Sequence, residues 1–124
     1  MAHVPTTPAF EGIDLTESFV LGWQRGNDLV ISMEFCLCED HPQYRTPPPG
    51  EWACFVRGFI QFLHLKALDG LPEMDAVKGA VDATGERDFG HIEGIGFANG
   101  DFWLECEFGT ISGTSDPPTV SLDP

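Results

Sequence analysis

The fold of this chain is decided by the stretch Gly90-His-Ile-Glu-Gly-Ile-Gly-Phe-Ala-Asn-Gly-Asp-Phe-Trp-Leu-Glu-Cys-Glu-Phe-Gly-Thr-Ile111. Two extended runs flank Asn99-Gly100, which is a strong hairpin signal because both central residues of a type I′ turn need positive φ. The second run alternates with a period of two, which predicts a half-buried strand. One face of that run holds Phe102, Leu104, Cys106 and Phe108, and the other holds Trp103, Glu105 and Glu107.

An earlier hairpin is predicted from Ser18–Gln24 and Leu29–Cys38, joined by Arg25-Gly26-Asn27-Asp28. Its second strand alternates cleanly, and a shift of one residue would expose its whole apolar face, so we expect a firm register. That apolar face consists of Leu29, Ile31, Met33, Phe35 and Leu37.

The other segments predict further strands and little helix. The Pro-rich segment Glu39–Gly50 is expected to be a loop, because proline has no N–H for a β-ladder. Glu51–Leu68 is the longest extended run, and Gly58 at its centre predicts a bulge or a sharp bend. Pro72–Val81 has the apolar spacing of a short helix, with an irregular loop as the alternative.

Together these signals predict a mainly β fold, an antiparallel sandwich or a partly open barrel of about six to eight strands with at most one short helix. The length of 124 residues predicts a single domain. Residues 1–12 are rich in Pro and Thr and are expected to form a loosely ordered lead-in. A last short strand is predicted at Thr119–Leu122.

Charge is the main compositional signal. The chain has 20 acidic and 6 basic residues, which gives a net charge of −14. Such a surface repels nucleic-acid phosphates and anionic lipid and attracts cationic partners. We therefore expect a basic protein as partner, with no nucleic acid and no membrane; acidity that serves only solubility is the competing explanation.

Location and redox state follow from the same reading. No apolar run is long enough to span a bilayer, and the first residues lack the basic and apolar segments of a secretion signal. We expect a cytoplasmic protein whose four cysteines are thiols.

The densest group of potential metal ligands is Cys36, Cys38 and His41, which Cys54 and Cys106 would join if their strands were neighbours. Structural zinc sites usually have paired Cys knuckles, and here only one Cys-x-Cys occurs, so we expect buried apolar thiols and no metal. His64 and His91 are the histidines considered as bases for a cysteine nucleophile, but nothing in the sequence pairs them with one. No motif for a catalytic centre or a cofactor is present, and we expect neither enzyme activity nor a cofactor.

Trp103, Glu105 and Glu107 are the candidate binding residues. An exposed Trp among carboxylates suits a cationic partner protein, whereas a plain solvated sheet face is the structural alternative. Glu105 and Glu107, or Glu93 across the hairpin, also have the residue types of an acid/base pair.

The order of motifs resembles a known class of proteins. The hairpin ending in Phe-Cys-Leu precedes His-Pro-Gln-Tyr and a Pro-rich loop. Glu-Trp-Ala-Cys-Phe-Val-Arg-Gly-Phe-Ile-Gln-Phe, Phe-Gly-His-Ile-Glu-Gly-Ile and Leu-Glu-Cys-Glu-Phe-Gly-Thr-Ile-Ser-Gly follow. This pattern, over most of residues 15–122, is similar to small bacterial β-rich proteins, some of which look like immunity proteins of polymorphic or contact-dependent toxin systems. The resemblance implies a stoichiometric binder and transfers no site residue.

The sequence thus predicts a protein-binding module, in one form an immunity-type inhibitor of a basic toxin. A small-molecule pocket lined by Trp23, Trp52 and several Phe is the first alternative. A structural or oligomer-forming module is another, because edge strands pair readily.

Overall fold

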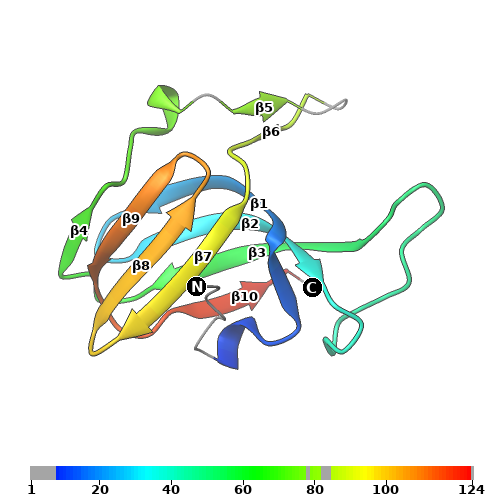
Figure 1. The fold of residues 1–124 in the computed structure, drawn as a ribbon, viewed down its shortest axis with the longest axis horizontal. Helices are drawn as coiled ribbons and strands as arrows, with labels where there is room; N and C mark the ends of the chain where they lie inside the picture. Colours follow the sequence, from blue (N-terminus) through cyan, green and yellow to red (C-terminus); the bar gives the residue numbers. More distant parts are fainter. Residues whose placement is uncertain (1–7, 78, 82–84, 124) are drawn as a thin grey trace.

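The computed structural model describes residues 8–77, 79–81 and 85–123. Two four-stranded antiparallel sheets lie face to face, with sheet B in front of sheet A in the view of Figure 1. The mainly β sandwich predicted from the sequence is confirmed, and the two sheets do not form a closed barrel.

Sheet A has the order β1 (Ile13–Arg25), β2 (Leu29–Leu37), β3 (Cys54–Phe62) and β10 (Thr119–Leu122). Sheet B has the order β4 (Ala67–Asp69), β9 (Gly109–Thr114), β8 (Asp101–Cys106) and β7 (Ile92–Ala98). A small arm consists of β5 (Ala80–Val81) and β6 (Arg87–Asp88). In the part of the chain that the structure describes, the helices are two short 3-10 turns, η1 (Pro8–Phe10) and η2 (Met74–Ala76), and none could span a membrane.

The Asn99-Gly100 hairpin forms as predicted. Both residues have positive φ, 54° and 84°, and Ala98 pairs with Asp101 across the turn. Phe102, Leu104 and Cys106 are buried on the inner face of β8. Phe108 is an exception to the predicted alternation, because β8 ends at Cys106 and Phe108 lies in the following turn.

The β1–β2 hairpin also confirms the predicted inner face. Its five alternating apolar residues are at most 3% exposed, and β2 pairs with β3 along its whole length without a register shift. These residues are Leu29, Ile31, Met33, Phe35 and Leu37. A central strand with one completely buried face is the firmest part of the sandwich.

The inner faces of the two sheets meet in one apolar core. Phe62 of β3 stacks on Phe102 of β8, with ring centroids 4.2 Å apart. Along one side the sheets are also joined by backbone: Val20 donates its N–H to the carbonyl of Gly90 at 2.8 Å, and Phe89 donates to Val20 at 2.8 Å. Backbone hydrogen bonds therefore join β1 of sheet A to the segment that leads into β7 of sheet B.

Gly58 does not form the predicted bulge or bend. It pairs in regular register with Met33 on one side and Leu122 on the other. A Cβ at position 58 would lie far inside van der Waals contact of the Ser121 carbonyl oxygen, so glycine is needed for the close approach of β10. The chain instead leaves sheet A over Leu63–Lys66, where His64 has a φ of 53°.

Two further predictions concern Pro72–Val81 and residues 1–12, and the first of them is wrong. The short helix over Pro72–Val81 is absent from its described residues, which form an extended segment, the 3-10 turn η2 and strand β5; residue 78 lies outside the described part. Trp23 explains this, because its indole N–H donates to the Pro72 carbonyl at 3.0 Å and ties the segment to β1. In the predicted lead-in 1–12, residues 8–12 are docked, with Phe10 3% exposed, and residues 1–7 lie outside the description.

Replacing Gly58 by Ala tests the close approach of β10. We expect Gly58→Ala to lower the free energy of unfolding by about 1–3 kcal/mol, because the methyl group forces β10 away from β3. The measurement is urea denaturation followed by fluorescence. Gly26→Ala is the matched control, because a Cβ at position 26 would have no atom within 4 Å apart from those of the neighbouring residues in the chain. Equal stability of the two variants would contradict this account.

Candidate protein-binding surface

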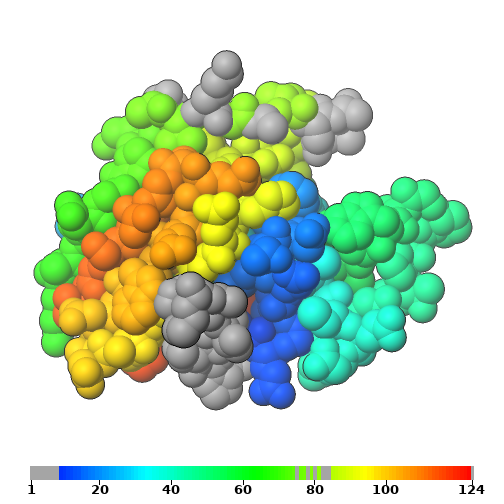
Figure 2. Space-filling model, in the orientation of Figure 1, coloured from blue at the N-terminus to red at the C-terminus, as the bar shows by residue number. Residues whose placement is uncertain are grey.

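The outer face of sheet B carries the predicted binding residues. Since Phe102 and Leu104 point into the core, their neighbours in β8 point outward. Pairing across the sheet places Asp69, Ser112, Trp103 and Gly96 in one row. We call this outer surface the acidic face; its outward positions are Ala67, Asp69, Gly94, Gly96, Ala98, Asp101, Trp103, Glu105, Thr110, Ser112 and Thr114. It is turned toward the viewer in Figure 2, where β7 to β9 are yellow to orange.

Trp103 lies flat against the sheet because Gly96, its neighbour on β7, has no side chain in the way of the indole ring. A Cβ at position 96 would overlap the indole ring, and one at position 94 would lie 3.2 Å from the Glu105 carboxylate. The two glycines of β7 therefore give the side chains of β8 room to lie down on the neighbouring strand. Trp103 remains partly exposed and Glu105 is exposed.

The charge of sheet B has a single sign. Its four strands contain no Lys, Arg or His, and their acidic residues are all exposed: Asp69, Glu93, Asp101 and Glu105. Sheet A differs, because Arg25 and Arg57 lie in its strands. The strands of sheet B thus contribute four exposed carboxylates and no basic side chain.

Glu107 differs from the other two predicted residues. It lies in the turn after β8, where its carboxylate accepts the backbone N–H of His91 at 2.5 Å. The structure therefore brings Trp103 and Glu105 together on the acidic face and assigns Glu107 a contact that holds the start of β7.

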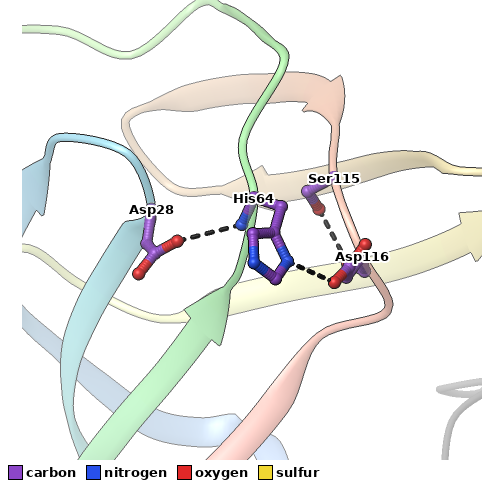
Figure 3. A network of polar contacts seen from close by, with 4 residues as sticks. All are labelled: Asp28, His64, Ser115 and Asp116. Carbon is purple, nitrogen blue, oxygen red and sulfur yellow. Dashed lines mark hydrogen bonds and ion pairs between the residues drawn. The ribbon is translucent and has the colours of Figure 1, made fainter.

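A polar network that the sequence does not predict lies at one end of the sandwich (Figure 3). His64 donates its backbone N–H to Asp28 at 2.9 Å, and its Nδ1 lies 2.6 Å from the Asp116 carboxylate. The network joins three turns, because His64 is 36 residues from Asp28 and 52 residues from Asp116 in the chain. No local sequence signal could have revealed contacts over such separations.

This network links loops at the surface of the protein. The His64 side chain is 76% exposed, and the nearby Ser115 hydroxyl donates to the backbone carbonyl of Asp116 and not to the imidazole. No activated nucleophile results from this arrangement. Asp116 raises the pKa of His64 above its ordinary value of 6.5, first through the hydrogen bond and second through its charge.

All four cysteines are free thiols, as predicted, and three are buried: Cys36, Cys54 and Cys106. Burial is the main cause that raises the pKa of Cys36 to about 11 and that of Cys106 to about 12; nearby acidic groups, chiefly Asp14 and Glu93, add to it. These two thiols are therefore protonated at neutral pH and poor nucleophiles. Cys38 is exposed, and its pKa is also raised, by burial and then by Asp14 and Asp40.

The potential metal ligands Cys36, Cys38 and His41 do not form a group that could hold a metal ion. His41 turns into its own loop, where Nδ1 accepts the backbone N–H of Gln43 at 3.0 Å. Across residues 8–77, 79–81 and 85–123, no three His, Cys, Asp or Glu side chains are grouped to hold a metal ion.

The other two tryptophans have separate environments. Trp23 is 9% exposed and packs between Phe89 and Phe108, with centroid distances of 5.0 and 4.8 Å. Trp52 is 68% exposed and contacts Phe55 on the outer side of sheet A. Trp23 borders an open hollow of about 520 Å³ that Trp52 does not reach, so the two do not line a common pocket.

The His64–Asp116 contact predicts a pH-dependent stability. Because the pKa is raised in the folded protein, its stabilisation is complete below about pH 6.5 and is lost as the pH rises through the folded pKa. We expect the difference in free energy of unfolding between the wild type and Asp116→Asn to shrink from about pH 5.5 to about pH 9. Urea denaturation across this range measures it. In a His64→Asn background, where Asn tolerates positive φ, the pH dependence should vanish; if it persists, another group is responsible.

The burial of the thiols predicts selective labelling. With a disulfide reagent at neutral pH, we expect Cys38, the exposed thiol, to react faster than the three buried thiols in the folded protein, and all four thiols to react after unfolding. A time course of absorbance and mass spectrometry of the labelled peptides measures both. Cys38→Ser should remove the fast phase; rapid labelling of Cys36 or Cys106 would contradict the assigned burial.

Comparison with models of protein families, with curated proteins and with solved structures finds no match to this chain.

Proposed function

We propose that this protein is a stoichiometric binding module that holds a basic partner protein against the acidic face of sheet B. The observation that carries the proposal is the composition of that sheet: its strands have exposed carboxylates, no basic residue, and Trp103 lying flat among them. We place this function in the cytoplasm, where the free thiols of the chain are expected to persist.

Electrostatics favours such a partner at long range. A surface of one sign focuses the field of the protein and raises the rate of encounter with an oppositely charged molecule by roughly 10- to 1000-fold at low salt. The net charge of −14 also opposes binding of nucleic acid, whose phosphates would be repelled. Rim charges of this kind set the association rate and its salt dependence more than the final affinity.

Trp103 supplies the short-range part of the interaction. Aromatic residues near the centre of an interface are frequent hot spots, because they bury a large area at a low cost in conformational entropy. Contact with Gly96 already restricts the indole in the free protein. Little side-chain order then has to be gained on binding.

The form of this function that the sequence resemblance implies is an immunity-type inhibitor of a basic bacterial toxin. An acidic face that covers a basic active-site surface would neutralise a toxin without any chemistry by the inhibitor. The protonated state of Cys36 and Cys106 agrees with a binder that does not use these thiols as nucleophiles.

Truncation of Trp103 tests the proposal. We expect Trp103→Ala to weaken binding of the partner by about 2 kcal/mol or more, roughly 30-fold. The partner is first captured from a lysate of the natural host at low salt and released at high salt. Calorimetry with the purified partner then gives the affinities.

Trp52→Ala, at an exposed tryptophan on the other sheet, is the matched control and should bind like the wild type. Capture of a protein without net positive charge, or equal loss of affinity in the two variants, would contradict the assignment of the acidic face. Thermal unfolding of both variants confirms that they are folded.

A further inference from the structure

A shallow hollow lies beside Trp103 on the acidic face. Its volume is about 410 Å³, and its lining includes Trp103, Asp69, Asp101, Ser112 and Thr114. The pairing of the strands places the small side chain of Ser112 on β9 between Asp69 on β4 and Trp103 on β8, and it places Thr114 between Ala67 and Asp101. The hollow is therefore a consequence of residue size along three adjacent strands.

The two carboxylates of this hollow, Asp69 and Asp101, lie in different rows of the sheet. Asp69 occupies the row of Ser112 and Trp103, whereas Asp101 occupies the next row, opposite Thr114. Thr114 donates its hydroxyl to Asp101 Oδ1 at 3.1 Å, which orients that carboxylate. The basic residue nearest to β4 along the chain, Lys66, is not part of the lining.

We infer that this hollow receives an arginine side chain of the basic partner, with the guanidinium between Asp69 and Asp101 and in contact with the side of Trp103 that borders the hollow. The inference rests on the proposed function and names the residue type that the acidic face recognises. The exposed carboxylates of the face complement a cation.

Arginine fits this site better than lysine. Its guanidinium is planar, is weakly hydrated and stacks on aromatic rings while it donates hydrogen bonds within its own plane. The several N–H groups of one guanidinium can donate to carboxylates on two sides of the hollow. A lysine ammonium is a compact, strongly hydrated charge and would use the ring and the two carboxylates less completely.

A peptide assay separates recognition of arginine from attraction by charge. The probes are capped hexa-arginine, hexa-lysine and hexa-citrulline peptides, the last having the arginine shape without its charge. Binding is followed by ¹⁹F NMR of the protein labelled with 5-fluorotryptophan, with signals assigned through Trp52→Phe and Trp103→Phe. We expect hexa-arginine to move the Trp103 signal and not the Trp52 signal, and to bind about fivefold more tightly than hexa-lysine.

Carboxylate variants locate the bound side chain. Asp69→Asn and Asp101→Asn should each weaken hexa-arginine about fivefold relative to Glu93→Gln, which removes one charge from the same sheet outside the hollow. All these positions are exposed, so unchanged thermal midpoints are expected.

Different results would contradict the arginine site and the proposed function. Equal affinity for the arginine and lysine peptides, or equal effects of the three carboxylate variants, would overturn the arginine site while salt-sensitive binding to the acidic face still stood. Hexa-arginine binding that leaves the Trp103 signal unmoved would also overturn it. No binding of either cationic peptide at low salt would contradict the proposed function as well.

Discussion

The stacking of Phe62 on Phe102, 4.2 Å apart, is the contact on which the rest of the molecule depends. It joins β3 of one sheet to β8 of the other at the centre of the apolar core. Burial of apolar surface is the main favourable contribution to folding, and each large aromatic side chain buries much of that surface. Once these inner faces meet, the alternation of the strands assigns the outward positions of both sheets outside the register shifts in β1 and β7.

The two outer faces then have different chemistry. The strands of sheet B present acidic side chains and no basic ones beside Trp103, and the edge strand β7 has glycine at positions 94 and 96. The glycines serve the surface and not the backbone conformation, since neither has a positive φ. They let Trp103 and Glu105 lie against the sheet. Sheet A places aromatic residues outward too, yet beside basic side chains such as Arg57, which pairs with Glu86.

Polar groups away from the acidic face support the fold. The His64–Asp116 contact and the hydrogen bond from His64 to Asp28 close the end where the chain passes between the sheets. Glu107 holds the backbone of His91 at the beginning of β7. The buried thiols occupy apolar positions, where burial keeps them protonated. The histidines His64 and His91 and the buried thiols are thus engaged in separate parts of the fold.

The sequence by itself determined both hairpins, the inner faces of β2 and β8, and the outward direction of Trp103 and Glu105, because turn chemistry and a period of two are local properties. The tertiary structure alone decided what depends on distant segments. Gly58 is needed for the approach of β10, and the Pro72 carbonyl is bound by Trp23 instead of by a helix. The acidic face likewise exists only because pairing places Asp69 in the row of Trp103, across strands far apart in the chain.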